Sequence, residues 1–364
     1  MLYQGGTRLF LFFPLTFLLS SCTVSPVTGI EDSELESWRV ESEFSIIRSI
    51  EFSSNGDLML ITGEAETSES GNVEIWDTDN WELIQTLETE RAYNLNAYFL
   101  SEDNKEILVV SASGKVSVFH TETGIKEKIL VEGLEQDSVA LPVDFSTSQQ
   151  LLSLSSPEGI LLLNTNTGEE YVLPLVANNN YWWQSIAFSE DGAYLALLTS
   201  PQDDNNNLPS IVHIFDVETQ VKISSIEISS HSVIDIVFIN NRYFALSGVD
   251  GFLEIRDFET GEVVKDLSLK TPLRYNSLAR ARINSMPEST FFAVGSNAAT
   301  GTYSVVGEIT LWSADSAEPL CSTGKMSDTA FVNPAVAISP DGQYLAGVAG
   351  GDVVVWNTEP CFQR

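Results

Sequence analysis

The three histidines are the first residues to consider, because imidazole is a frequent metal ligand and a general base near neutral pH. They are His120, His213 and His231, and they fall in different copies of the repeat described below, at different positions within it. A metal site needs three or four ligands within bonding distance of one ion. Nothing in the sequence makes these side chains converge, so we expect each to have an ordinary structural role.

Other motifs of catalysis or cofactor binding are missing from the chain. The run Asp203-Asp204-Asn205-Asn206-Asn207 offers the oxygen ligands that calcium prefers, but it lacks the glycine and the distal glutamate of a calcium loop, which favours a solvated loop. The sequence contains no G-x-G-x-x-G, phosphate loop, G-x-S-x-G or H-E-x-x-H motif. We therefore predict no catalytic residue, no cofactor and no metal.

Aromatic residues recur before a repeated Phe-Ser pair and are the main candidates for a binding site. Counting back eight or nine residues from the serine, or its equivalent, gives Phe44, Tyr93, Tyr181, His231, Tyr275 and Phe331, with Trp182 and Trp183 beside Tyr181. Aromatic rings give large contact areas and the neighbouring asparagines give directional hydrogen bonds, a combination suited to a protein, peptide or sugar ligand. The alternative is that these rings fill gaps between structural units.

A basic cluster stands out in this acidic chain. Lys265, Lys270, Arg274, Arg280 and Arg282 are five of only 18 basic residues. Arg274 and Arg280 are candidates for binding an anion or a carboxylate. A structural alternative is that Arg282 neutralises the carboxylates of Glu51 and Asp144, which occupy one repeat position.

A repeat of about 43 residues organises the chain. An apolar segment ends in a bulky residue followed by a polar one, and an x-T-x-T-G turn or a degenerate form of it comes next. The pairs are Trp76-Asp77, Phe119-His120, Leu163-Asn164, Phe215-Asp216, Arg256-Asp257, Trp312-Ser313 and Trp356-Asn357. The two longer intervals contain polar insertions at 200–210 and 296–307.

Each repeat contains four apolar segments separated by turn signals. A strand ends near Phe-Ser, an Asp-Gly or similar hairpin turn leads to a second strand, a third carries the bulky residue, and a fourth follows the x-T-x-T-G turn. Four short strands in a period of this length are typical of a propeller blade. The sequence therefore predicts an all-β fold of seven four-stranded antiparallel blades.

Parts of these repeats resemble the WD-repeat family. The dipeptide Trp76-Asp77, the segment SPDGQYLA at 339–346 and the segment SGVDGFLEIRD at 247–257 are similar to its motifs, and the resemblance covers 36–364. The Gly-His pair that usually opens such a repeat is absent. The resemblance implies a seven-bladed β-propeller in which the buried His, Asp and Trp hydrogen-bond network of the family is incomplete in every blade.

The two ends of the repeat region should meet. Only seven residues follow Asn357, too few for a fourth strand of the last blade, whereas Glu36 to Ser42 precede the first repeat. We expect this N-terminal segment to complete the last blade as its outermost strand, which removes an exposed sheet edge. The propeller domain is then 35–364.

The N-terminus predicts export and lipid attachment. An apolar run from Leu9 to Leu19 follows Arg8 and is too short to span a bilayer, and Leu19-Ser20-Ser21-Cys22 resembles a bacterial lipobox. We predict a lipoprotein signal peptide at 1–21, lipidation of Cys22, a flexible tether at 22–34 and an extracytoplasmic location, in the outer membrane facing the periplasm if the host has two membranes. A plain secretory signal and an uncleaved membrane helix are the alternatives.

The two remaining cysteines, Cys321 and Cys361, are an even pair and would form a disulfide in an oxidising compartment. Cys321 belongs to the sixth predicted blade and Cys361 to the seventh, and both lie toward the same face. Neighbouring blades allow the two Cα atoms to come as close as a disulfide requires. Two buried free thiols are the alternative.

Charge limits the choice of partner. The chain has 51 acidic and 18 basic residues and a formal net charge of -33, which disfavours nucleic acid and anionic membrane surfaces. We predict a lipid-anchored, monomeric scaffold that binds a protein or peptide of the cell envelope, and no enzyme. The alternatives are a lactonase-like or quinoprotein-dehydrogenase-like propeller enzyme, a carbohydrate-binding or peptide-binding envelope lipoprotein, and a role in outer-membrane assembly.

Overall fold

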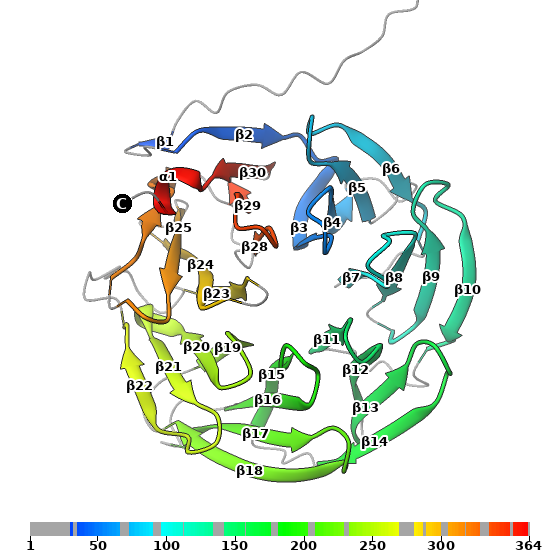
Figure 1. Ribbon diagram of the computed structural model, residues 1–364, viewed down its shortest axis with the longest axis vertical. Coiled ribbons are helices and arrows are strands. Elements are labelled where there is room, and N and C mark those ends of the chain that lie inside the picture. The colour runs from blue at the N-terminus through cyan, green and yellow to red at the C-terminus, as the bar shows by residue number, and fades with distance from the viewer. Residues whose placement is uncertain are drawn as a thin grey trace, which may run out of the picture.

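The structure is a computed structural model, and it describes residues 30–31, 35–65, 73–89, 96–111, 113–133, 142–156, 158–175, 181–202, 208–228, 233–268, 280–286, 289–299, 305–316, 318–327, 335–349 and 352–362. Seven antiparallel sheets are arranged in a ring around a central axis (Figure 1). This arrangement confirms the predicted seven-bladed β-propeller.

Five blades are consecutive runs of four strands along the chain. Blade one contains β3 (Phe44–Phe52), β4 (Leu58–Ala65), β5 (Val73–Asp77) and β6 (Leu83–Leu87). Blade two contains β7 (Asn96–Phe99), β8 (Glu106–Val110), β9 (Val116–His120) and β10 (Lys126–Val131). Blade three contains β11 (Val143–Ser146), β12 (Leu151–Ser156), β13 (Gly159–Asn164) and β14 (Glu170–Pro174). Blade four contains β15 (Tyr181–Phe188), β16 (Tyr194–Pro201), β17 (Ser210–Asp216) and β18 (Val221–Ile228). Blade five contains β19 (Val233–Phe238), β20 (Tyr243–Gly248), β21 (Leu253–Asp257) and β22 (Val263–Asp266), with the 3-10 turn η2 (Val249–Gly251) before β21.

Blade six is the irregular one. Its three inner strands are β23 (Arg280–Ser285), β24 (Phe291–Ala299) and β25 (Val305–Ser313), and its outer edge is divided into β26 (Cys321–Ser322) and β27 (Lys325–Ser327). A further short strand, β1 (Ile30–Glu31), pairs antiparallel with β27. The segment 22–34 was expected to be a tether throughout, so the structure differs from that expectation at these two residues.

Blade seven closes the ring with strands from both ends of the chain. It contains β28 (Val336–Ile338), β29 (Tyr344–Ala349) and β30 (Asp352–Asn357), followed by the short helix α1 (Glu359–Phe362). The fourth strand is β2 (Ser37–Val40), which pairs antiparallel with β30 from Ser37 opposite Trp356 to Val40 opposite Val353. This pairing confirms the predicted closure by the N-terminal segment.

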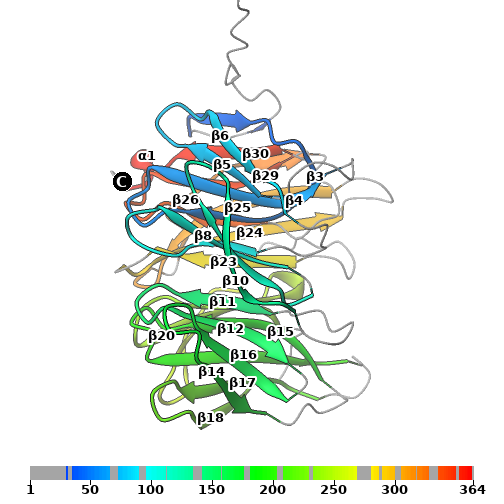
Figure 2. The ribbon, with the colours of Figure 1, turned by 90° about the vertical axis from the view of Figure 1, so that its right-hand side faces the viewer.

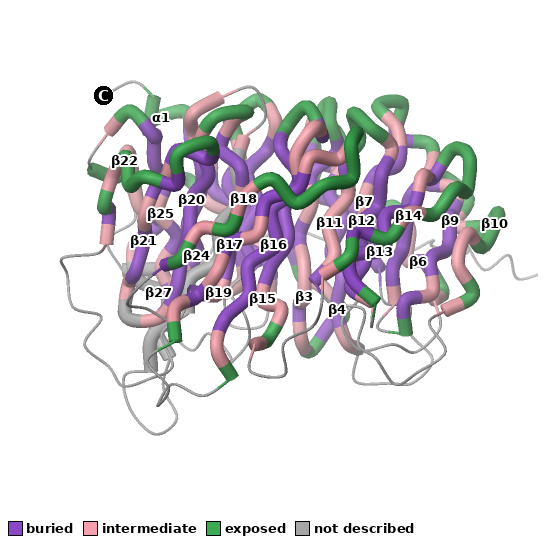
Figure 3. The backbone as a smooth tube through the Cα atoms, turned by 90° about the horizontal axis from the view of Figure 1, so that it is seen from below, coloured by how far each residue is buried: buried purple, intermediate pink, exposed green. Residues whose placement is uncertain are grey.

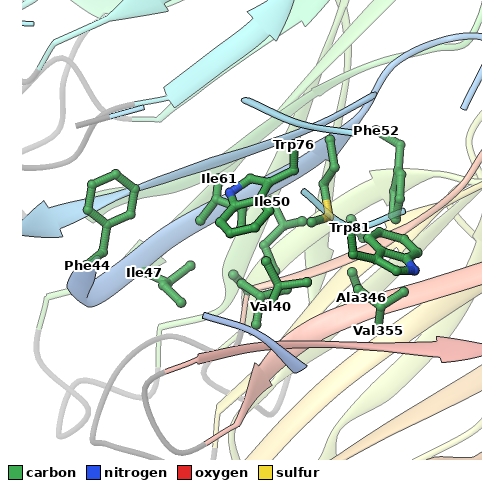
Figure 4. Close-up of a cluster of buried hydrophobic side chains, with 14 residues drawn as sticks. Val40, Phe44, Ile47, Ile50, Phe52, Ile61, Trp76, Trp81, Ala346 and Val355 are labelled. Carbon is green, nitrogen blue, oxygen red and sulfur yellow. The ribbon is translucent and has the colours of Figure 1, made fainter. Parts of the chain in front are cut away.

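Side chains reinforce this closure between blades seven and one. Arg39 of β2 forms an ion pair with Asp352 of β30. The rings of Trp38 and Trp81 stack with centroids 6.3 Å apart, and Tyr344 meets Trp81 edge-on at 5.1 Å. Aromatic pairs at such distances add stabilisation beyond their buried area. Around them, buried side chains of β2, of blade one and of blade seven form one apolar cluster (Figure 4).

The apolar core is divided among the spaces between blades. Each buried cluster joins apolar side chains of one blade to those of its neighbour, as in the cluster that contains Leu198, Val212, Phe238 and Phe244 of blades four and five. Figure 3 shows the buried residues within the strands and the exposed ones mainly at the turns and on the outer strands. Blade contact therefore buries the apolar strand faces, which a single four-stranded sheet could not do.

The predicted x-T-x-T-G turns have a recognisable hydrogen-bond geometry. The Oδ1 atom of Asp257 accepts hydrogen bonds from the backbone N–H groups of Glu259 and Thr260, and Gly261 follows with φ +72°. Asp77 accepts in the same way in blade one. There Trp81 occupies the left-handed position with φ 56°, a conformation that glycine adopts more readily. Its ring packs between blades, which offsets the backbone cost.

A disulfide joins the last two blades. Cys321 of β26 and Cys361 of α1 are bonded, and their Cα atoms are 5.6 Å apart. The predicted pairing of these two cysteines is therefore present in the structure. Because a cross-link between distant positions restricts the unfolded chain, this bond stabilises the seam between blades six and seven.

Candidate functional site

The two faces of the ring differ because the innermost strand of each blade begins at one face and ends at the other. Figure 2 shows the ring from its edge. We call the face on which the innermost strand of each blade begins the entry face, with Phe44 and Tyr181 as examples. We call the opposite face the turn face. It carries the tight hairpins between first and second strands, such as 53–57 and 189–193, where Gly56 and Gly192 donate to Ser53 and Ser189.

The three aromatic residues at the start of β15 differ in exposure on the entry face. Tyr181 is half-buried and lies opposite Pro201, while Trp183 is half-buried and packs against a cluster of buried apolar residues of blades three and four. Trp182, between them, is 58 % exposed and lies opposite Ser200. Leu208, near the start of β17, is also exposed, at 39 %. The Trp182 ring is therefore free to contact a partner, whereas Trp183 is largely a packing residue.

Phe44 occupies the corresponding place in blade one and has a different environment. It is only 4 % exposed and belongs to the apolar cluster between blades seven and one. The Phe44 ring therefore fills the space between two blades and is not available to a ligand. The burial of Phe44 shows that the repeat does not impose exposure of an aromatic side chain at the start of an innermost strand; of the two such starts that the structure describes, blade four has the exposed ring.

Several candidate residues lie outside the described residues. They are Cys22, Tyr93, the run 203–207, His231, Lys270, Arg274, Tyr275 and Phe331. Arg280 and Arg282 belong to β23, so the backbone of blade six carries them on its innermost strand, but their side chains are outside the description too. The proposed anion site and the proposed pairing of Arg282 stay predictions.

The two described histidines have separate environments. His213, on β17, lies 3.3 Å from Thr199 Oγ1 through Nε2 and 3.2 Å from Ser225 Oγ through Nδ1. Burial lowers the pKa of His213 to about 4, so this ring is neutral at physiological pH. His120 lies in blade two, at the turn face. Among the residues that the structure describes, no group of three or more His, Cys, Asp or Glu side chains could hold a metal ion.

A central cavity of about 1090 Å³ lies inside the ring and is lined by the innermost strands. Three of its lining residues occupy the same position of successive blades, directly before a phenylalanine near the end of the innermost strand. They are Glu51 on β3, Tyr98 on β7 and Asp144 on β11. The repeat position shared by Glu51 and Asp144 was visible in the sequence, but the cavity and the contribution of Tyr98 were not.

Hydrogen bonds connect this group to neighbouring blades. Asp144 Oδ2 accepts the backbone N–H of Phe188, 2.7 Å away on β15. Tyr98 donates its hydroxyl proton to the carbonyl oxygen of Val143 at 3.2 Å. Ser185 donates to Asp235 Oδ1 at 2.6 Å, which links blades four and five on the same wall. The carboxylates therefore also tie the innermost strands together.

The surroundings of these acids favour their neutral forms. Burial, with a smaller effect of the Asp144 charge, raises the pKa of Glu51 to about 8. Burial also raises the pKa of Asp144 to about 7, against the opposing effect of its backbone hydrogen bonds. The pKa of the Tyr98 hydroxyl is raised well above its usual value by burial and by both acids. Enclosed carboxyl groups that titrate near neutrality are typical of binding and catalytic sites, although structural networks also produce them.

Two of the three tryptophans of the repeat pairs, Trp76 and Trp312, make local contacts in place of the family network. Trp76 donates from Nε1 to Oε2 of Glu74 at 3.0 Å, and Trp312 donates from Nε1 to Thr310 Oγ1 at 2.8 Å. Glu74 also accepts the backbone N–H of Glu43 at 2.9 Å. A side chain two residues earlier on the same strand thus satisfies each of these two rings, whereas the buried Nε1 atom of Trp356 has no hydrogen-bond partner among the residues that the structure describes.

Within the described ranges, no helix is long and apolar enough to cross a membrane. The comparison with curated proteins finds no match to the chain. Residues 38–77 match the family model described as WD domain, G-beta repeat. This match begins in β2 of blade seven and ends at Asp77 of blade one, so the repeat unit of the sequence straddles two blades. Propellers of such repeats serve as modules for protein interaction or scaffolding and are typically not enzymes. The chain is a WD-repeat-like seven-bladed β-propeller, with one repeat matched by the family model.

Proposed function

We propose that this propeller is a lipid-anchored, extracytoplasmic scaffold that binds a protein or peptide of the cell envelope through the entry face of blade four. The observation that carries the proposal is the 58 % exposure of Trp182, beside Tyr181 and Trp183 on β15. Large aromatic residues dominate the energy of protein interfaces when a partner covers them. The fold does not require an exposed tryptophan here, because Phe44 is buried at the corresponding place.

Blade four offers the elements of such an interface close together. Pro201 and Ser200 lie opposite Tyr181 and Trp182 on the neighbouring strand, and the hydroxyl of Ser200 is held by the carbonyl oxygen of Val233 at 2.6 Å. A rigid pair of strands therefore presents the Trp182 ring. An aromatic anchor that is already ordered loses little conformational entropy when a partner covers it.

Replacing Trp182 by alanine is expected to weaken partner capture about thirtyfold, which corresponds to about 2 kcal/mol. Capture would be measured by affinity purification from membranes with the N-terminus intact, followed by quantitative mass spectrometry. Stability should change little because the ring is exposed. Ile125→Ala is the matched control, since Ile125 is an apolar residue exposed to 64 % after the end of β9 at the turn face. Equal loss in both variants, or no loss in a folded Trp182→Ala protein, would place the binding surface elsewhere.

The anchoring part of the proposal is supported by the segment Leu19-Ser20-Ser21-Cys22. We expect the mature protein to begin at Cys22 with an acylated thiol, and mass spectrometry of the N-terminal peptide tests this directly. Cys22→Ser should release the protein from membranes into the soluble fraction. An N-terminus at Thr23, or an intact Met1, would contradict lipid anchoring while leaving the binding surface untouched.

A further inference from the structure

We propose that the short strand β1 turns the entry face toward the membrane, so that the partner covering Trp182 is a protein of that same membrane. The inference deepens the function proposed above and rests on its lipid anchor at Cys22. It follows from the place and the direction in which the N-terminal segment joins the ring.

The strand β1 joins the propeller at the outer edge of blade six, and Figure 1 shows it at the rim of the ring. Ile30 pairs with Met326 of β27, and Met326 in turn pairs with Gly307, the third residue of β25. Because the strands of a blade alternate in direction, the third strand begins at the same face as the innermost one, which is the entry face. The strand β1 therefore lies near the entry-face end of this outer edge.

The direction of β1 is also defined. It pairs antiparallel with β27, and β27 pairs antiparallel with β25, which starts at the entry face. The strand β27 therefore runs toward the entry face and β1 runs away from it. Further along the chain, Leu35 is buried in one apolar cluster with Trp356 and Cys361, near the turn face where β30 ends and α1 begins. The chain thus enters the domain from the side of the entry face.

The connection between the anchor and the domain is short. Seven residues, 23–29, separate Cys22 from Ile30. Because an extended chain advances at most about 3.6 Å per residue, the lipidated thiol must lie within about 29 Å of Ile30. A bilayer against the turn face would require the connection to pass back along β25 from Gly307 to Ser313, which is about 20 Å. That path uses most of the reach and costs more conformational entropy than an approach from the entry face.

This orientation limits the kind of partner that the entry face can meet. Trp182, 58 % exposed on blade four, then lies on the side of the ring that faces the bilayer. The formal net charge of -33 repels anionic lipid headgroups, so the bilayer itself is a poor ligand for this face. A protein embedded in the membrane or attached to it can instead cover the ring with complementary groups.

The orientation is tested by energy transfer from the acylated mature protein to labelled lipid headgroups in phosphatidylcholine liposomes. A fluorescent amino acid would replace Leu208 at the entry face or Glu218 at the turn face, which are both exposed residues of blade four. Because the two faces are separated by the length of a strand, we expect transfer about twofold more efficient from position 208. Ile30→Pro, which cannot keep the β1 pairing, should reduce this difference, whereas Ile30→Val should not.

Equal transfer from the two positions in membrane-bound protein, or an unchanged difference in Ile30→Pro, would overturn the orientation and leave the lipid anchor intact. A protein that carries no acyl group and does not attach to liposomes would instead refute the anchor, and the inference with it. In cells, a protein crosslinked from position 182 should stay with the membranes after alkaline extraction, and a soluble one would contradict the proposed partner class. Liposome binding by unacylated Cys22→Ser protein that is lost on Trp182→Ala substitution would show that lipid, not protein, occupies the face.

Discussion

Replacing Val40 by aspartate should lower the free energy of unfolding by about 4 kcal/mol or more, the scale expected when an unpaired charge is placed in a core. Val40 is the last residue of β2, is 1 % exposed and belongs to the apolar cluster between blades seven and one (Figure 4). Because β2 supplies the fourth strand of blade seven, the substitution should destabilise the contact between blades seven and one, which closes the ring. Chemical denaturation followed by tryptophan fluorescence measures it.

The control for this substitution is the next residue. Glu41 is exposed and lies just beyond β2, so Glu41→Lys should change the denaturation midpoint little. Limited proteolysis provides a second measurement, since an open ring should be cut near β2 and β30 first. If Val40→Asp unfolded at the same denaturant concentration as the native sequence, closure by the N-terminal strand would contribute little to stability.

The second large effect concerns Glu51 and pH. Its pKa in the folded protein, about 8, is higher than the ordinary value of 4.5, so the folded state binds a proton more tightly than the unfolded state does. The contribution of Glu51 to the free energy of unfolding is therefore fully present below pH 4.5 and is lost as the pH rises through 8. The partial exposure of the side chain screens the effect, so we expect a loss of about 2 kcal/mol between pH 5 and pH 8.5.

Glu51→Gln should remove that part of the pH dependence, because an amide does not ionise. At pH 8.5 the variant should be more stable than the native protein by about 2 kcal/mol, and near pH 5 the two should be nearly equal. Denaturation midpoints measured across this range provide the comparison, with Glu218→Gln as an exposed control. A native protein whose stability does not fall toward pH 8.5, or a variant with the same pH profile, would contradict an enclosed Glu51 carboxyl.

The number of blades and the closure could be predicted because each depends on local patterns that repeat. The polar residue after each bulky strand end marks a turn, and Asp77 and Asp257 make the same side-chain to backbone hydrogen bonds. The pairing of Ser37–Val40 with β30 then followed from counting strands. In contrast, β1 contains only Ile30–Glu31, which is too short to show a periodic pattern.

The candidate site was harder to predict because exposure depends on the geometry of neighbouring strands. Trp182 and Trp183 are adjacent, but a register irregularity between Trp183 and Ser185 changes the alternation of side chains along β15. The sequence could therefore not tell which ring packs and which is exposed. The grouping of Glu51, Tyr98 and Asp144 around the cavity could be recognised only in the closed ring, because the three residues belong to different blades. Only their shared repeat position was visible beforehand.

The most direct test of the scaffold proposal is site-specific photocrosslinking in the producing cells. A photoreactive aromatic amino acid, which keeps a ring at the position of the anchor, would replace Trp182 at the entry face or Ile125 at the turn face, both in the otherwise native full-length protein. We predict that the Trp182 position yields a discrete crosslinked envelope protein and that the Ile125 position does not. A folded, membrane-attached protein that gives no crosslink from Trp182, or the same products from both positions, would contradict binding through the entry face of blade four.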